Sequence, residues 1–207
     1  MTGGSYFVLE GADGCGKSAQ AASLTRWLEA QGASVLHLRE PGSTPLGESL
    51  RRLLLDPAGS DLRDVTEALL FTAARAELVQ KVVEPALAEG RIVIAERCFA
   101  STLVYQGLAR DDGLDADWLV ELTRRAHGPC MPARIFVLDV PAEIARSRRR
   151  GHDEDRFENR GGDYHERVRR GYLSLPRTDP TCVVIDASRD FDAVQRELRE
   201  RVIAELR

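Results

Sequence analysis

The chain has 207 residues, of which 43% are hydrophobic and 30% charged, the composition of an ordinary globular protein. Its net charge of -4 disfavours a general nucleic-acid-binding protein, and no apolar stretch approaches the roughly 18 residues that a membrane span needs. The N-terminus has neither the basic flank nor the apolar run of a signal peptide. We therefore expect a cytoplasmic protein with a single domain over residues 1–207.

The periodicity of the apolar residues predicts short strands that alternate with helices. In the first half of the chain, the predicted elements are a strand at 5–10, a glycine-rich turn at 11–18, a helix ending at Gly32, a strand at 35–38, helices at 46–55 and 65–89, and a strand at 92–95. They are followed by helices at 101–109 and 116–127, a strand at 134–140, a helix to about 150, a helix with an apolar face over 164–175, a strand at 182–186 and a helix at 191–206. Strands that are apolar on both faces are typical of a parallel sheet covered by helices. We expect an α/β fold with three layers, in which about five parallel strands carry helices on both faces.

The turn after the first strand matches the pattern G-x-x-x-x-G-K-[ST] at every fixed position. Its residues are Gly11, Ala12, Asp13, Gly14, Cys15, Gly16, Lys17 and Ser18. The glycines allow backbone N–H groups to curl around phosphate oxygens, and Lys17 brings a positive charge to the β- and γ-phosphates. The Ser18 hydroxyl is a ligand for Mg²⁺. The sequence therefore predicts a P-loop NTPase fold that binds ATP with Mg²⁺.

Other features of the chain narrow the class of P-loop protein. A GTPase needs an Asn-Lys-x-Asp motif to recognise its base, but the sequence has no such motif and only two lysines, Lys17 and Lys81. A motor or transporter ATPase usually carries added domains. The other cations are arginines, whose planar guanidinium suits phosphate, although a GC-rich genome also favours arginine. A chain of this size favours a small kinase.

Four further motifs follow the P-loop. They are Arg39-Glu40-Pro41-Gly42, Phe71-Thr72-Ala73-Ala74-Arg75, Glu96-Arg97-Cys98-Phe99-Ala100-Ser101-Thr102-Leu103-Val104-Tyr105-Gln106-Gly107 and Asp155-Arg156-Phe157-Glu158. In order and spacing, the five motifs resemble the thymidylate kinase family over nearly the whole chain. The resemblance implies a nucleoside monophosphate kinase that phosphorylates dTMP to dTDP with ATP and Mg²⁺, a step toward dTTP. No general base is expected, because the acceptor phosphate is already an anion.

Catalysis of this reaction requires positive charge around the transferring phosphoryl group. Lys17 and Arg97 are the expected catalytic cations outside the lid. By resemblance, Arg39 and Arg97 hold the acceptor phosphate at the carboxyl ends of two strands, where ligands bind in open α/β sheets. Asp13 matches the family's carboxylate near the sugar 3′-hydroxyl and the phosphates. For a single arginine at such a position, the alternative is a surface salt bridge.

The resemblance also assigns the base and the sugar of the acceptor. Phe71 matches the ring that stacks on thymine, although a core position on its helix is the alternative. Arg75, one turn later, is implied to hydrogen-bond the base. Thr102 and Gln106 are expected to read the base edge. Tyr105 is expected to pack on the sugar and to disfavour a 2′-hydroxyl.

Three positions depart from the family pattern or leave a choice open. Glu96 stands where the family usually has Asp, and we expect it to face Mg²⁺ together with Ser18. Asp139 ends another strand and is the alternative carboxylate, but Glu96 is preferred because Arg97 follows it. Cys98 and Val104 also differ from the usual residues, which bears on substrate preference and not on the reaction class.

A charged, glycine-bounded loop at about 149–162 is expected to be a mobile lid that excludes water. One branch of the family has an arginine at the P-loop position of Gly14, and the other places its catalytic arginines in the lid. This chain resembles the second branch, with Arg149 or Arg150 as the expected catalytic residue. Glu158 matches the lid carboxylate, or else is a solvated charge. The arginines of this region are Arg146, Arg148, Arg149, Arg150, Arg156 and Arg160.

The sequence leaves alternative functions open. The nearest is another nucleoside monophosphate kinase or a deoxynucleoside kinase, which the motifs at 39–42 and 105–107 disfavour. Others are a catalytically silent ATP-binding regulator and a nucleic-acid-dependent ATPase. By resemblance we also expect a homodimer that binds dTMP and ATP, with no nucleic-acid or membrane partner.

Overall fold

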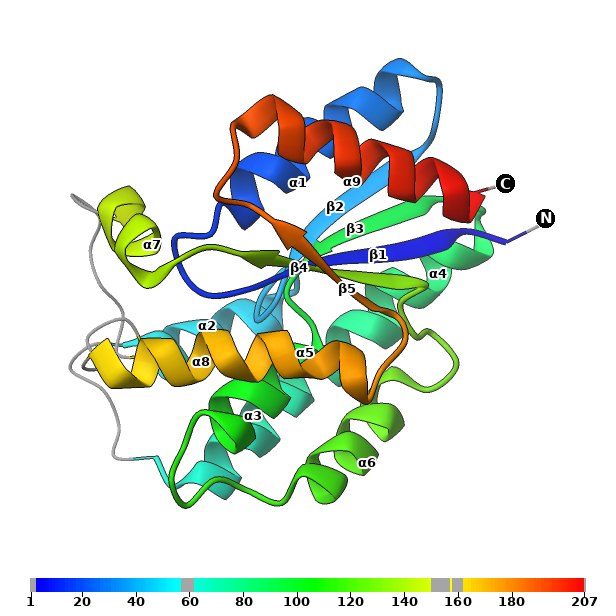
Figure 1. Cartoon of the computed structure of the whole chain (residues 1–207). Coiled ribbons are helices and arrows are strands. Elements are labelled where there is room, and N and C mark those ends of the chain that lie inside the picture. Colours follow the sequence, from blue (N-terminus) through cyan, green and yellow to red (C-terminus); the bar gives the residue numbers. More distant parts are fainter. Residues whose placement is uncertain (1–2, 57–61, 150–156, 158–161, 207) are drawn as a thin grey trace.

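The computed structural model of the chain describes residues 3–56, 62–149, 157 and 162–206, and Figure 1 shows their arrangement. These residues form a sheet of five parallel strands in the order β2-β3-β1-β4-β5. Each strand ends within one residue of its predicted limit, so the predicted sheet is confirmed. The strands are β1 (Ser5–Glu10), β2 (Val35–Arg39), β3 (Ile92–Glu96), β4 (Arg134–Asp139) and β5 (Cys182–Asp186).

Helices cover both faces of this sheet and give the predicted three layers (Figure 1). Along β1, Tyr6 and Val8 belong to one apolar core, and Phe7 and Leu9 belong to the other. Successive side chains of a strand point to opposite faces, so one strand supplies both cores. The helix α1 (Lys17–Ala30) and the C-terminal helix α9 (Phe191–Leu206) cover the face of Phe7.

The opposite face carries most of the remaining helices. Here lie α3 (Asp64–Leu78), α5 (Phe99–Thr102), α6 (Ala116–His127) and α8 (Gly162–Ser174), with α2 (Pro45–Leu55) against α3. The helix α7 (Ala142–Arg149) follows β4, and a 3-10 turn, η3 (Leu175–Arg177), follows α8. The predicted helices at 46–55, 116–127 and 191–206 are confirmed.

Two predicted helices are interrupted by π-helical turns. The segment predicted as one helix at 65–89 consists of α3, the π-turn η1 (Val79–Val83) and α4 (Glu84–Ala88). Pro85 has no N–H to donate within an α-helix, which accounts for the wider turn before it. The segment predicted as a helix at 101–109 begins two residues earlier as α5 and continues as the π-turn η2 (Leu103–Leu108). π-turns often occur at functional sites.

The five strands end at one edge of the sheet, and each ends on a charged residue. These residues are Glu10, Arg39, Glu96, Asp139 and Asp186. In the registers, Glu96 lies beside both Leu9 of β1 and Arg39 of β2. Chains of this architecture bind ligands at this edge.

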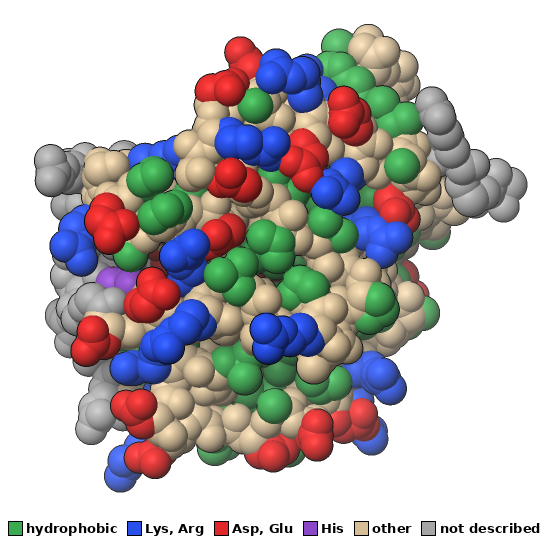
Figure 2. All heavy atoms as spheres, viewed as in Figure 1, with side chains coloured by type: hydrophobic (Ala, Val, Ile, Leu, Met, Phe, Trp, Pro, Cys, Tyr) green, Lys and Arg blue, Asp and Glu red, His purple; other side chains and the backbone are tan. Residues whose placement is uncertain are grey.

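The outer surface mixes charges of both signs. Figure 2 shows acidic and basic side chains interspersed over one face of the molecule, in keeping with the small net charge. Among the described residues, no helix has the length and hydropathy of a membrane span.

A buried histidine makes stability depend on pH. His127 is 1% exposed, and its ring packs edge-on against Phe99 with centroids 5.5 Å apart. Burial, and then the nearby charge of Arg75, lower the pKa of His127 from 6.5 to about 3. The unfolded chain binds a proton at this histidine near pH 6.5, whereas the folded chain does not until about pH 3. The histidine therefore favours the folded state fully above pH 6.5, and this contribution is lost as the pH falls.

We expect the free energy of unfolding to fall by about 1.4 kcal/mol per pH unit below pH 6 through His127. Urea unfolding at pH 7.5, 6 and 5 measures this slope. His127→Leu should unfold more easily at pH 7.5 but should lose this part of the pH dependence. An unchanged slope in His127→Leu would assign the acid sensitivity to other groups.

Candidate functional site

The P-loop lies between β1 and α1, as predicted. Gly11, Gly14 and Gly16 all have positive φ, and a Cβ at Gly11 would lie 2.5 Å from the carbonyl oxygen of Leu138, so only glycine fits there. The Lys17 ammonium donates to the carbonyl oxygens of Gly11 and Ala12, each 3.0 Å away. The lysine thus lies across the loop, with its ammonium group beside the loop backbone.

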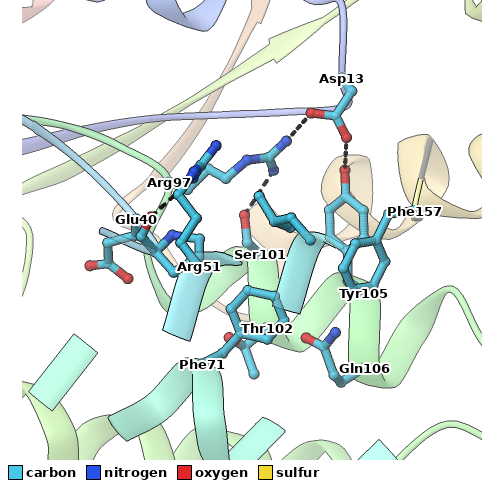
Figure 3. Close-up of a pocket in the computed structure, with 12 residues that line it drawn as sticks. Asp13, Glu40, Arg51, Phe71, Arg97, Ser101, Thr102, Tyr105, Gln106 and Phe157 are labelled. Atoms are coloured by element: carbon cyan, nitrogen blue, oxygen red, sulfur yellow. Dashed lines mark hydrogen bonds and ion pairs between the residues drawn. The ribbon is translucent and has the colours of Figure 1, made fainter. Parts of the chain in front are cut away.

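Cys15 and Asp13 of the P-loop differ in where their side chains lie. The Cys15 thiol is buried in the apolar core, so this residue offers only its backbone to a ligand. The Asp13 side chain instead points away from the loop into the neighbouring cavity described below (Figure 3).

The predicted pair for Mg²⁺ is assembled beside the loop. The Ser18 hydroxyl donates to Glu96 Oε2, and Glu96 Oε1 lies 3.0 Å from His37 Nε2. Burial alone would raise the pKa of Glu96, but hydrogen bonds from His37 and Ser18 outweigh it and lower the pKa. Glu96 is therefore a carboxylate at neutral pH. His37 was not predicted; its position two residues before the end of β2 is the only sequence signal.

The alternative carboxylate is engaged elsewhere. Both oxygens of Asp139 accept hydrogen bonds from Arg169 of α8, at 2.7 and 2.9 Å. This arrangement ties β4 to α8 and supports the choice of Glu96 for the metal.

A cavity of about 340 Å³ opens next to the P-loop (Figure 3). Its volume is in the range of small-molecule sites. Of the described residues, twelve line it, and six of these were predicted from the sequence: Asp13, Phe71, Arg97, Thr102, Tyr105 and Gln106. The sequence assigned no role to the other six: Glu40, Pro41, Ser101 and Phe157 stand within the quoted motifs, and Arg51 and Leu55 stand outside them.

Arg97 lies at the end of the cavity nearest the P-loop. Its backbone has φ of 71°, and its guanidinium forms an ion pair with Asp13. It also donates to the hydroxyls of Ser101 and Tyr172, at 3.1 and 3.2 Å. Tyr105 donates to the second oxygen of Asp13 at 2.9 Å. Burial would lower the pKa of Arg97, but Asp13 and the other acidic neighbours raise it well above its ordinary value, so the cation persists.

A buried carboxylate, Glu10, supports this arrangement from below. Glu10 is fully buried, and its Oε1 accepts the backbone N–H groups of Cys98 and Ser101 at 2.8 and 3.0 Å. Its Oε2 accepts the hydroxyls of Ser101 and Tyr172 at 2.8 and 2.9 Å. The same two hydroxyls accept hydrogen bonds from Arg97, so Glu10 fixes the position of the guanidinium through them.

The opposite end of the cavity carries Phe71, Thr102 and Gln106. Arg75 does not line the cavity: it is 2% exposed and pairs with Glu40 at 2.6 Å. Two nitrogens of Arg75 donate to Thr102 Oγ1 at 3.2 Å, so it stands behind the threonine.

Phe71 faces the cavity and does not have the core position that was the alternative prediction for it. Its ring is tilted against that of Phe157, with centroids 6.1 Å apart. Phe157 also meets the ring of Tyr105 edge-on at 5.7 Å, so three aromatic rings form one wall. Phe157 belongs to the predicted lid motif, which was the signal that its neighbourhood mattered.

Arg39 lies apart from the other predicted residues. Its side chain is 53% exposed and pairs with Glu48 at 3.6 Å, outside the cavity lining. Arg51 of α2 lines the cavity instead and donates to the Pro41 carbonyl at 2.9 Å. Its spacing from Leu55, one turn later, is the signal that could have placed both on the same helix face.

The predicted lid lies mostly outside the described residues. This holds for Arg150, Arg156, Glu158 and Arg160, and for Arg149 only the helical backbone is described. Of this region, Arg148 approaches the P-loop: it donates to the carbonyl oxygens of Ala187 and Cys15 at 3.2 and 3.5 Å.

A glycine-rich P-loop beside an aromatic-walled cavity with a charged end is the arrangement expected of a P-loop nucleotide kinase. The family model described as "Thymidylate kinase" matches residues 9–198. The chain is 46% identical to the thymidylate kinase of Symbiobacterium thermophilum over 95% of this chain and 92% of that protein. It is 39% identical to the thymidylate kinase of Caulobacter vibrioides over 100% of this chain and 99% of that protein. It is 43% identical to the thymidylate kinase of Chlamydia pneumoniae over 88% of this chain and 89% of that protein. The chain belongs to the thymidylate kinase family.

Proposed function

We propose that this protein transfers the γ-phosphoryl group of ATP to dTMP and releases ADP and dTDP. The observation that carries the proposal is the cavity beside the P-loop, with an arginine at one end and Phe71, Thr102 and Gln106 at the other. A nucleoside monophosphate has the same polarity, with an anion at one end and a flat ring at the other. Family membership selects dTMP among such acceptors.

The transfer forms a bond between an oxygen of the dTMP phosphate and the γ-phosphorus of ATP. The bond from that phosphorus to the β–γ bridging oxygen breaks, and ADP leaves. No proton must be removed from the nucleophile, so the chain needs cations and positioning instead of a base. Lys17 and Arg97 supply charge at the two sides of the transferring group. Asp13 holds Arg97 and Tyr105 in place through its two oxygens.

Mg²⁺ fits the pair formed by Ser18 and Glu96, because this ion takes few protein ligands and keeps waters and phosphate oxygens around it. Ser18 would bind it directly and Glu96 through water. When bound, the ion neutralises charge on the β- and γ-phosphates.

Phe71 would stack on the base, and Tyr105 would pack on the sugar between the two ends of the cavity. Arg51 would assist Arg97 at the acceptor phosphate, in the role that the sequence assigned to Arg39. Support for this exchange is that Arg51 lines the cavity, whereas Arg39 is half exposed and paired with Glu48.

We propose that the chain is a single domain and that the loop at about 149–162 acts as its lid. It would bring Arg149 or Arg150 to the transferring group and Glu158 to the acceptor. Support comes from its flanks: Arg148 reaches the P-loop at one end, and Phe157 lines the cavity within it.

We infer that two copies of the chain associate. The neighbouring helices α2, α3 and α6 expose large apolar side chains, which a second copy would cover. These are Leu46, Leu53, Val65, Leu69 and Trp118. Analytical ultracentrifugation decides between monomer and dimer.

The proposed activity is tested with a panel of acceptors. ADP release is measured with ATP, Mg²⁺ and each of dTMP, dUMP, UMP, CMP and AMP. The highest kcat/KM is expected for dTMP. Preference for any other acceptor in the panel would refute the assignment.

A further inference from the structure

We propose that Glu67 sets the base specificity of the acceptor cavity by fixing which end of the Gln106 amide faces the base. The inference rests on the proposed function and identifies a positioning residue within it. Glu67 is not part of the cavity lining and lies on α3, behind Gln106.

The hydrogen bonds around Gln106 determine the orientation of its amide. Gln106 Nε2 lies 2.8 Å from Glu67 Oε2, and Glu67 is 1% exposed. A carboxylate accepts hydrogen bonds and does not donate them, so the nitrogen of the amide must face Glu67. The reversed amide would bring two oxygens together in a buried place, which is costly.

The guanidinium of Arg110 holds the Glu67 side chain in position. Arg110 forms ion pairs with Glu67 and Asp64, and its Nε donates to the Tyr105 carbonyl at 2.9 Å. The carboxylate that orients Gln106 is therefore tied to the backbone of the preceding residue in η2.

With its nitrogen held by Glu67, Gln106 presents its oxygen to the cavity. Figure 3 shows this oxygen on the side of Phe71 and Thr102, with the nitrogen on the opposite side. Among the described residues, no donor is bonded to this oxygen. The side chain therefore offers the base a hydrogen-bond acceptor.

Thr102 offers the opposite polarity. Its Oγ1 accepts from two nitrogens of Arg75, so its own proton is directed elsewhere. Thr72 and Thr123 donate to the carbonyl four residues earlier, at 2.7 and 2.6 Å. For Thr102 that carbonyl belongs to Cys98 and already accepts Arg75 at 2.9 Å. The Thr102 hydroxyl is thereby free to donate into the cavity.

An acceptor beside a donor matches the imide edge of thymine or uracil, which presents N3–H next to a carbonyl oxygen. Cytosine presents an unprotonated N3 next to an amino group, the reverse pattern. Both polarities are fixed by buried ionic groups, Glu67 behind Gln106 and Arg75 behind Thr102. A flipped Gln106 amide would accept cytosine better and thymine worse.

The test compares Glu67→Met with Glu67→Gln, which differ in whether residue 67 still offers an acceptor. The readout is the ratio of kcat/KM for dTMP to that for dCMP. In Glu67→Met we expect this ratio to fall by roughly ten- to a hundredfold, since Gln106 is free to turn. In Glu67→Gln the new amide oxygen can accept from Gln106 and Arg110, so most of the ratio is retained. dUMP shares the imide edge and should lose as much as dTMP.

Asp64→Asn is the matched control, because Asp64 pairs with Arg110 and does not touch Gln106. In this variant the ratio of kcat/KM for dTMP to that for dCMP should equal that of the unaltered protein. An unchanged ratio in Glu67→Met, or an equal fall in Asp64→Asn, would overturn the role of Glu67. If Glu67→Met does not fold, Glu67→Met/Arg110→Met removes the buried pair together and takes its place, with the same expected ratio. Failure of the unaltered protein to phosphorylate dTMP would refute the proposed function instead.

Discussion

Arg97→Ala is expected to lower kcat by about a thousandfold while changing ATP affinity by only a few fold. The guanidinium is the cation placed at the P-loop end of the cavity, held by Asp13, Ser101 and Tyr172. ATP depends on the P-loop and Lys17, which the substitution leaves in place. Steady-state ADP release and titration of ATP binding separate the two effects.

Arg39→Ala provides the comparison for Arg97. Both arginines lie at the carboxyl end of neighbouring strands, but Arg39 is outside the cavity lining. We expect a loss of less than about tenfold, as for an exposed ion pair. Equal losses of kcat in the two variants would show that Arg39 also holds the acceptor phosphate, as the sequence predicts.

Glu10→Ala is expected to have the largest effect on stability, lowering the free energy of unfolding by about 4 kcal/mol. The substitution leaves the N–H groups of Cys98 and Ser101 without their acceptor and opens a void under the site. Turnover should fall as well, because the hydroxyls that hold Arg97 lose their anchor. Urea unfolding and kcat measure the two losses.

Glu10→Gln separates the hydrogen bonds of Glu10 from its charge. An amide oxygen at the position of Oε1 accepts both N–H groups, and the hydroxyls of Ser101 and Tyr172 can turn to accept from the amide nitrogen. We expect a loss of less than about 1 kcal/mol. A loss as large as that of Glu10→Ala would show that the negative charge is the essential property.

The sequence was most informative where function depends on neighbouring residues along the chain. The P-loop is contiguous, and its glycines, Lys17 and Ser18 have the predicted places. Short strands that are apolar on both faces allowed the parallel sheet to be predicted within one residue at each end. The local patterns were sufficient here because the chemistry and the backbone geometry are set by adjacent residues.

The remaining features of the site arise from contacts between distant segments. Arg75 has the spacing to share a helix face with Phe71, yet Glu40 and Thr102 hold it behind the cavity wall. Arg51 has no motif of its own and enters the cavity because α2 packs against α3. The π-turns also went unpredicted, because apolar periodicity does not distinguish one extra residue in a turn from the regular helix.

The continuous segment formed by α5 and η2 has a geometric consequence for the acceptor. Ser101 and Tyr105 face Arg97 and Asp13, while Thr102 and Gln106 face the opposite end of the cavity. One continuous stretch of backbone, α5 with η2, therefore sets the separation between the Arg97 end of the cavity and the end that carries Thr102 and Gln106. We expect a free nucleoside to bind more weakly than the monophosphate, because it lacks the phosphate that would reach Arg97.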